Sequence, residues 1–267
     1  MLARQRQERI LEEVRRTGGA RVSDLVELLN VSDMTVRRDI GILAGKGLVS
    51  RVHGGATAIT GRSAEEPGFA AKSGLQTAEK EAIAHAAVTV VAPGDSVAIS
   101  AGTTTYAVAR ELLAVPHLTV VTNSVPVGEV LHASGRDDLT VVLTGGVRTP
   151  SHALTGPVAV AALHSLHVDW LFLGVHGFDD RAGFTTPNLV EAETDRALVR
   201  CARRVVVVAD STKWRVVGLS SIARLDEVDV LVTDSGLDDE AQQLVRARVP
   251  RLVLAEPLVQ LHREGPT

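Results

Sequence analysis

Small residues with hydroxyl or amide groups follow three short apolar runs in the middle of the chain. The first run leads into SAGTTT (residues 100–105), the second into TNS with Asn123, and the third into TGG with Gly145. A helix N-terminus presents free backbone N–H groups to an anion, and neighbouring hydroxyls add donors. Each segment alone is also a common helix cap or tight turn. Three such segments at equivalent places favour a site for a phosphorylated polyol.

Charged residues later in the chain have the chemistry to complete such a site. Lys213 could neutralise a phosphate, and carboxylates at Asp169, Glu191 and Asp210 could accept sugar hydroxyls. The alternative is that Asp210 only caps a turn and that Glu191 only begins a solvated helix. Carboxylates with a lysine also include the groups needed to move a proton beside a carbonyl, which leaves a sugar-phosphate isomerase open as an alternative. The histidines show no metal-ligand spacing, so we expect neither a metal nor a cofactor.

A second kind of chemistry is indicated near the start of the chain, where adjacent arginines lie on a predicted helix. Apolar residues at Val36, Ile40 and Leu43 repeat on one helical face, which puts Met34 and Arg38 on the opposite face. Small residues there permit close approach to a DNA major groove, and arginine pairs with guanine edges or phosphates. The alternative is a solvated helix with two surface arginines.

The context of this helix favours nucleic-acid binding. A shorter amphipathic helix at 22–29 precedes the helix that carries the arginines. Ser32 is suited to cap the N-terminus of the arginine-bearing helix, so we expect that helix to begin at about Asp33. Two short extended runs follow at 48–51 and 52–53 and end at a Gly-Gly pair. They predict a β-wing that carries Arg51 and His53 beside the helix.

The strings SDMTVRRD (residues 32–39) and RVHGGA (residues 51–56) resemble the winged helix-turn-helix of DeoR-type bacterial transcription regulators. That resemblance implies a head that binds double-stranded operator DNA. The residues to which it assigns DNA contacts are Ser32, Met34, Thr35, Arg37 and Arg38 in the helix, with Arg51 and His53 in the wing.

The rest of the chain alternates apolar runs with helical patterns, which predicts a mostly parallel α/β sheet with both faces covered. The expected strands are 96–99, 119–122, 139–143, 170–174, 204–209, 228–232 and 251–254. The expected helices are 4–16 in the head and then 77–91, 106–113, 126–133, 158–163, 189–202 and 238–248. In such sheets, ligands bind beyond the carboxyl ends of the strands, where the polar segments lie.

Length and charge divide the chain in two. A chain of 267 residues suits two domains. Residues 1–56 hold 10 Lys and Arg against 7 Asp and Glu, whereas the remainder holds 18 against 25. We expect a DNA-binding domain at 1–57, a linker at 58–73 and an effector-binding and oligomerisation domain at 74–267. The single Cys201 excludes an intrachain disulfide, and without a long apolar run or a signal peptide we expect a cytoplasmic protein.

The expected domain at 74–267 also resembles the sensor domain of the DeoR family. The strings that carry this resemblance are TAEKEAIA, SAGTTT, VDWLFLGVHGF, GFTTPNLVEAETDRAL and ADSTKW. The resemblance implies a fold like ribose-5-phosphate isomerase and the coenzyme A transferases. It also implies a repressor of carbohydrate-catabolic genes that is released by a phosphorylated sugar or polyol. Separately, we expect a homo-oligomer, a dimer or a tetramer, and no enzyme activity, since an enzyme needs no groove-reading helix. The residues expected to hold phosphate are Gly102, Thr103, Thr104 and Thr105, and those expected to line the rest of the site are Asn123, Gly145, Asp169, Glu191 and Lys213. A different ligand, contacted by Arg148 and His152, stays an alternative.

Overall fold

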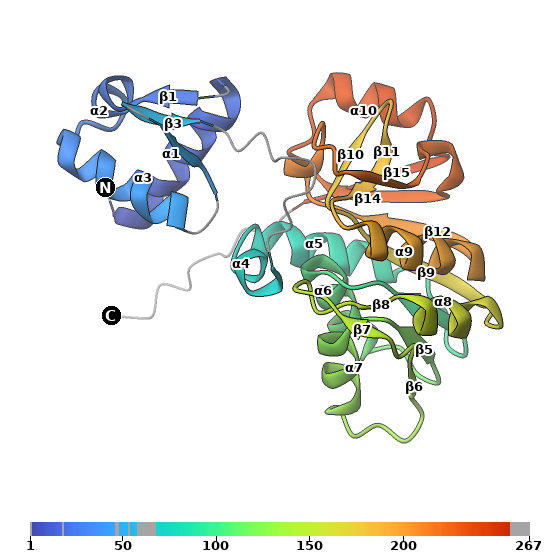
Figure 1. Ribbon diagram of the computed structural model, residues 1–267. Helices are drawn as coiled ribbons and strands as arrows, with labels where there is room; N and C mark the ends of the chain where they lie inside the picture. The colour runs from blue at the N-terminus through green and yellow to red at the C-terminus, as the bar shows by residue number, and fades with distance from the viewer. Residues whose placement is uncertain (1, 18, 46–47, 53, 58–67, 257–267) are drawn as a thin grey trace, which may run out of the picture. The chain divides into compact units, whose positions relative to one another are not determined.

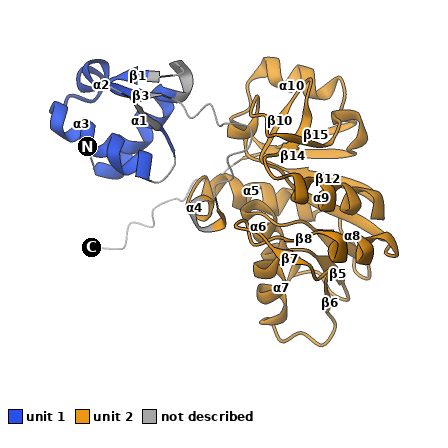
Figure 2. Cartoon of the chain, viewed as in Figure 1, with its two compact units in different colours: residues 1–62 blue, residues 63–267 orange. Residues whose placement is uncertain are grey.

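A computed structural model describes residues 2–17, 19–45, 48–52, 54–57 and 68–256 of the chain. The chain divides into two compact units, residues 1–62 and residues 63–267 (Figure 2), which we call the head and the body. Each unit has its own hydrophobic core and is described by itself. No helix in the described ranges is long and apolar enough to cross a membrane.

The head combines three helices with a three-stranded antiparallel sheet (Figure 1). Its elements are α1 (Ala3–Thr17), β1 (Gly19–Arg21), α2 (Val22–Leu29), α3 (Asp33–Gly45), β2 (Ser50–Val52) and β3 (Gly55–Thr57). Buried aliphatic side chains from all three helices form its core, including Ile10, Leu25 and Ile40. The predicted winged helix-turn-helix architecture is therefore confirmed.

The turn between α2 and α3 follows the predicted chemistry. Asn30 ends α2 in the left-handed conformation, with φ of 50°, which asparagine tolerates better than most residues. The Ser32 hydroxyl accepts the Thr35 N–H at 3.3 Å, so Ser32 caps α3 as expected.

The strands of the wing differ from the prediction. The expected runs 48–51 and 52–53 differ from the observed strands β2 and β3, and β1 joins them from the segment after the first helix, where we expected no strand. A three-residue strand is too short for a periodic signal, and its pairing partner is distant in sequence. A Cβ atom on Gly55 would lie 2.3 Å from the Ala20 carbonyl oxygen, so this close approach of β1 to β3 requires glycine.

The body is built around a seven-stranded sheet in which every neighbouring pair is parallel. Its order is β15-β14-β12-β9-β4-β5-β6. The strands are β4 (Ser96–Ile99), β5 (Thr119–Thr122), β6 (Thr140–Leu143), β9 (Val168–Gly174), β12 (Ala202–Val208), β14 (Val230–Asp234) and β15 (Arg251–Ala255). All seven predicted strands are therefore present, within two residues at each end.

Helices cover both faces of the sheet because alternate strand residues point to opposite sides. One hydrophobic cluster joins the sheet to α5 (Thr77–Val88), α6 (Thr103–Leu112) and α7 (Val125–His132). The other joins it to α8 (Pro157–His164), α9 (Leu189–Cys201) and α10 (Asp239–Arg246). On β4, for example, Val97 and Ile99 belong to the first cluster and Ala98 to the second.

Several short elements were not predicted. They are the antiparallel sheet of β10 (Gly177–Asp179), β11 (Gly183–Thr186) and β13 (Ser220–Ala223), the hairpin of β7 (Val147–Arg148) and β8 (Leu154–Thr155), and the single turns η1 (Ser211–Lys213) and η2 (Leu225–Glu227). A further short helix, α4 (Phe69–Ser73), lies within the stretch 58–73 that we expected to be a linker.

Candidate functional site

The helix α3 carries the candidate DNA-contacting residues of the head on its outward face. Met34 is 80% exposed although it is apolar, and Arg37 and Arg38 are also exposed. The Ser32 and Thr35 hydroxyls lie 2.8 Å apart at the start of the helix. Arg51 lies in β2, and His53 lies outside the described residues. The outward face of α3 therefore presents arginine with small and unbranched side chains, as a groove-reading helix requires.

The two arginines differ in their surroundings. Arg37 is paired with Asp33 one turn earlier, with Nε 2.5 Å from Oδ1 and Nη2 3.2 Å from Oδ2. This hydrogen-bonded pair raises the pKa of the Arg37 guanidinium. Within the part of the chain that the structure describes, Arg38 forms no ion pair. Arg38 is therefore the arginine of α3 that can meet an external anion without first breaking an internal pair.

In the body, the loop after β4 forms the N-terminus of α6. Gly102 is the N-cap and supplies no side-chain hydrogen bond to the helix. The backbone N–H groups of the first turn, at Thr103, Thr104 and Thr105, thus belong to the donors that a helix leaves without internal partners. Thr105 is fully buried and its hydroxyl donates to the Gly102 carbonyl at 3.1 Å. The geometry suits an anion at this helix end.

Neighbouring loops hold this segment in place. The Asn123 side-chain oxygen accepts the Ala101 N–H at 3.0 Å, and the Ser100 hydroxyl accepts the Gly174 N–H at 2.9 Å. Asn123 follows β5, and Gly174 ends β9, so the three adjacent strands β9, β4 and β5 are tied together at their carboxyl ends. Gly145 follows β6 at the same edge, in the left-handed conformation with φ of 71°.

Lys213 lies in η1, directly after β12, at the same edge of the sheet. Because β12 and β4 are separated only by β9, their ends are about 10 Å apart. The turn is fixed by two buried carboxylates. Asp210 accepts the Thr212 N–H at 3.2 Å, and Asp234, at the end of β14, accepts the Ser211 N–H at 2.7 Å.

A second lysine, Lys80 on α5, was not among the predicted residues. It is only 7% exposed, and its ammonium donates to the carbonyls of Lys72 at 2.8 Å and Leu75 at 2.5 Å. Burial lowers the Lys80 pKa, the nearby Asp210 opposes this shift, and Lys213 adds to it. Lys80, Asp210 and Lys213 are therefore close enough to interact. The sequence signal that could have found Lys80 is a lysine on the Ala-rich face of its helix, where burial would otherwise be unfavourable.

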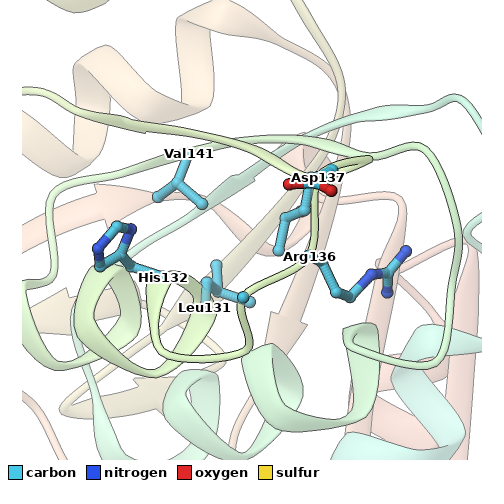
Figure 3. A pocket seen from close by; sticks show the side chains of 7 residues that line it. Leu131, His132, Arg136, Asp137 and Val141 are labelled. Carbon is cyan, nitrogen blue, oxygen red and sulfur yellow. The ribbon is translucent and has the colours of Figure 1, made fainter.

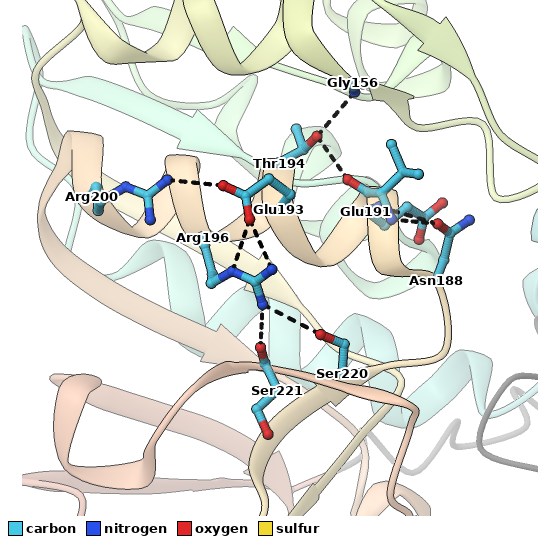
Figure 4. Close-up of polar contacts among 10 residues, drawn as sticks. Gly156, Asn188, Glu191, Glu193, Thr194, Arg196, Arg200, Ser220 and Ser221 are labelled. Atoms are coloured by element: carbon cyan, nitrogen blue, oxygen red, sulfur yellow. Dashed lines mark hydrogen bonds and ion pairs between the residues drawn. The ribbon is translucent and has the colours of Figure 1, made fainter.

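Glu191 lies in the first turn of α9, at the same edge as the hairpin β7–β8. Its carboxylate accepts the hydroxyls of Thr149, at 2.5 Å, and Ser151. Figure 4 shows how the start of α9 is held: Asn188 caps it by accepting the N–H groups of Val190 and Glu191, at 3.0 and 3.2 Å. Further along α9, the Arg196 guanidinium reaches the Ser221 carbonyl of β13 at 2.7 Å.

Asp169 does not belong to this site, which corrects our expectation. It lies near the start of β9 and accepts the N–H and the hydroxyl of Ser96, the first residue of β4, at 2.9 and 2.6 Å. These hydrogen bonds lower the pKa of the Asp169 carboxyl. Phe172, which is level with Ile99 at the carboxyl edge, comes three residues later, about 10 Å along the strand. The carboxylate therefore joins the amino ends of two strands and does not face the α6 N-terminus.

A groove of about 290 Å³ lies elsewhere on the body, between the end of α7 and the start of β6 (Figure 3). Its lining includes His132, Arg136 and Val141. The Arg136 guanidinium is already bound to Asp138, with Nη2 2.6 Å from Oδ2. The groove lies at the amino end of β6, away from the loops described above. The described residues also include no group of three or more His, Cys, Asp or Glu side chains placed to hold a metal ion.

Two family models match the chain. The DeoR-like helix-turn-helix domain matches residues 6–62, and the DeoR C-terminal sensor domain matches residues 75–235. The chain is 34% identical to the putative aga operon transcriptional repressor of Escherichia coli, over 94% of both chains. It is 36% identical to the HTH-type transcriptional regulator GlpR of Haloferax volcanii, over 92% of this chain and 96% of the relative.

Solved structures similar to the chain include ribose 5-phosphate isomerase A from Neisseria gonorrhoeae, at 16% identity and a TM-score of 0.38 over 51% of this chain and 52% of that one. The relatives of similar length are named as transcriptional regulators and not as enzymes. The isomerase alternative is therefore not supported. The chain belongs to the DeoR family of transcriptional regulators.

Proposed function

We propose that the protein represses carbohydrate-catabolic genes and leaves its operator when a phosphorylated sugar or polyol binds to the body. The observation that carries this proposal is the uncapped N-terminus of α6 at the same sheet edge as Lys213 and Lys80. Backbone donors at a helix N-terminus, together with ammonium groups, suit a phosphate. The name of one relative, a putative repressor, supports the direction of regulation.

The DNA-contacting part of the proposal rests on the exposed face of α3. Arg38 is the residue to which we assign the strongest contribution, because its guanidinium is exposed and forms no internal ion pair among the described residues. The other residues proposed to contact DNA are Ser32, Met34, Thr35 and Arg37, with Arg51 and His53 from the wing.

The effector is proposed to contact the carboxyl edge of the sheet. The residues assigned to it are Gly102, Thr103, Thr104, Thr105, Asn123, Gly145, Glu191 and Lys213, to which the geometry adds Lys80 and Asp210. Fructose, tagatose, glycerol and deoxyribose phosphates all share the phosphate that this arrangement suits. Hydroxyls of the sugar would find acceptors at Asp210 and Glu191.

The protein is proposed to act in the cytoplasm as a homo-oligomer, with at least two heads on one duplex. The head has a net charge of only +3 over residues 1–56, so a single head is expected to bind weakly. Two heads would read half-sites about 10 bp apart or a multiple of that spacing.

Thermal unfolding of the full chain tests the effector site. The panel is fructose 1-phosphate, tagatose 6-phosphate, glycerol 3-phosphate and deoxyribose 5-phosphate, each beside its unphosphorylated parent and beside inorganic phosphate. A compound present at about 100 times its dissociation constant should stabilise the protein by about 2.7 kcal/mol. We expect a shift with a sugar phosphate that is absent with its parent. An unshifted melting curve across the panel would contradict the assigned effector class.

The DNA side is tested with a duplex recovered from a random-sequence pool by selection on the full-length protein. Fluorescence anisotropy then gives the affinity for this selected duplex, with and without the sugar phosphate that shifts the melting curve. Release should lower the affinity by about 5- to 150-fold, the usual range of allosteric coupling. A higher affinity with the sugar phosphate would mean that it acts as a co-repressor or co-activator.

A further inference from the structure

The short helix α4 is the first described element of the body, and eleven residues, 58–68, lie between it and β3 of the head along the sequence. Any signal that passes along the chain from body to head must pass α4. Its contacts with the rest of the body therefore decide whether the effector site can influence the connection to the head.

At its N-terminal end, α4 is attached to the hairpin β7–β8 through Phe69. The Phe69 ring stacks on the His152 ring, with centroids 5.4 Å apart and planes 12° apart. The Phe69 N–H also points to the Pro150 carbonyl at 3.4 Å. Both partners belong to the tight turn 149–152, whose Thr149 and Ser151 hydroxyls bind Glu191. The turn 149–152 therefore connects Phe69, at the N-terminal end of α4, to Glu191, which we assign to the effector site.

The Phe69 ring also contacts α6, the helix whose N-cap is Gly102. Tyr106 lies in the first half of α6, three residues after Thr103, and its ring meets Phe69 edge to face with centroids 6.0 Å apart. Aromatic pairs with these geometries prefer defined orientations, so a displacement of either partner is felt by the other. Phe69 is therefore held between two segments that would both adjust to a ligand at Gly102 and Glu191.

At its C-terminal end, α4 is attached through Lys80. The Lys80 ammonium donates to the Lys72 carbonyl, inside α4, and to the Leu75 carbonyl just after it. An ammonium has three donors and no acceptors, so one that turns towards a phosphate gives up carbonyl partners. A ligand that recruits Lys80 would thereby loosen the last turn of α4.

The turn that carries His152 combines an unfavourable backbone conformation with hydrogen bonds to neighbouring loops. His152 adopts a left-handed backbone conformation with φ of 65°, which is unfavourable for a residue with a Cβ. Its N–H is bonded to the Thr149 carbonyl at 2.9 Å, and its carbonyl accepts the Val125 N–H at 3.2 Å. These bonds tie the strained residue to the start of α7, beside Asn123. A change at any of these loops would move the ring on which Phe69 stacks.

We propose that α4 couples the effector site to the head, and that Phe69 is the positioning residue through which this coupling passes. The proposal rests on the proposed function, because it requires a sugar phosphate at the carboxyl edge of the sheet. Occupancy of that edge would shift the Thr149–His152 turn, α6 and Lys80 together. Since α4 contacts all three, the attachment point of the segment 58–68 would change with them.

The test compares the full-length protein with Phe69→Ala in two measurements. The melting shift with the active member of the sugar phosphate panel reports effector binding. The ratio of affinities for the selected duplex without and with that compound reports coupling. We expect Phe69→Ala to keep the melting shift and the affinity for the duplex, while the ratio falls from about tenfold or more to about one. A ratio that stays at the wild-type value would overturn the proposal.

Conservative variants separate coupling from a loss of packing. Phe69→Tyr keeps the ring and should restore the wild-type ratio. Phe69→Leu keeps most of the apolar volume without the ring, and its ratio of duplex affinities should also fall towards one. This variant replaces Phe69→Ala in the test if the alanine variant does not fold. Leu244→Ala, which shortens a half-exposed aliphatic side chain on α10, is the matched control and should leave the ratio unchanged.

Failure of the coupling proposal is distinguishable from failure of the proposed function. A wild-type protein without a melting shift for any panel member would remove both. A wild-type protein that shows the shift and releases the duplex, beside a Phe69→Ala variant that releases it equally, would remove only the role of α4. The rate of tryptic cleavage after Arg62 gives a readout without DNA: the sugar phosphate should change this rate in the wild type and not in Phe69→Ala.

Discussion

The Arg6 guanidinium lies 2.5 Å from the Asp39 carboxylate, and this ion pair joins α1 to α3 inside the head. The Asp39 side chain is 3% exposed and that of Arg6 is 14% exposed. The Gln7 amide adds a second donor to Asp39 at 3.0 Å. The pair fixes how α3 sits on α1, at a position directly adjacent to Arg38 in the sequence.

Removal of the Asp39 carboxylate should destabilise the head. Asp39→Ala leaves Arg6 without its buried partner, and breaking a buried pair in this way costs about 3 to 5 kcal/mol. Thermal unfolding followed by circular dichroism should show a lower transition for the head. Asp24→Ala, at an exposed position on α2, should leave the transition in place. An unchanged transition in Asp39→Ala would mean that the pair contributes nothing to the fold of the head.

Arg38→Ala should weaken DNA binding without lowering the stability of the head. Because the side chain is exposed, its loss should leave the melting curve unchanged. Loss of a guanidinium that contacts a base should weaken binding to the selected duplex by about 1 to 3 kcal/mol. Anisotropy titrations measure this loss, and the melting shift with the sugar phosphate should persist. A variant with an unfolded head would instead show that Arg38 is structural.

Asp33→Asn should strengthen binding to the duplex. The substitution removes a negative charge from the N-terminal end of α3 and releases Arg37 from its ion pair. If the freed guanidinium reaches a phosphate, the slope of log affinity against log salt concentration should become steeper by about 0.9. Titrations between low and moderate salt measure the slope. Asp24→Asn on α2 is the matched control, and equal slopes in both variants would count against a DNA contact by Arg37.

Lys213→Ala should abolish the response to the sugar phosphate and leave DNA binding intact. The ammonium is within electrostatic range of Lys80, so its loss removes part of the positive charge available to a phosphate. The melting shift and the release of the duplex should both disappear. A normal response in this variant would show that the phosphate lies elsewhere.

Asp169→Ala should lower stability without changing the effector response. The loss of hydrogen bonds from Ser96 to a carboxylate should cost roughly 1 to 2 kcal/mol at neutral pH. Because the Asp169 pKa is lowered in the folded state, its contribution is present above the ordinary aspartate pKa and is lost as the pH falls through the lowered value. Denaturant titrations should therefore show the wild type and the variant converging in acid. A lost melting shift with the sugar phosphate would return Asp169 to the site.

Local patterns in the sequence predicted most of the regular structure. β-branched runs such as TVVT at 119–122 favour buried strands in a sheet covered on both faces, and the structure has β5 at those residues. Ser32 and the apolar spacing after it similarly determined where α3 begins. The same patterns predicted that polar loops would follow the strands, since hydrophobic periodicity fixes where each strand ends.

Tertiary structure alone decided which charged residues share a site. Asp169 in β9 binds Ser96 at the amino ends of two strands, whereas Lys213 follows β12 at the carboxyl edge of the sheet. Asp39 is buried because Arg6, 33 residues earlier, reaches it across a helix contact. Phe69 lies in a stretch without periodicity, and the role that we propose for it depends on its ring contacts with Tyr106 and His152. Such contacts join residues distant in sequence, and no local spacing encodes them.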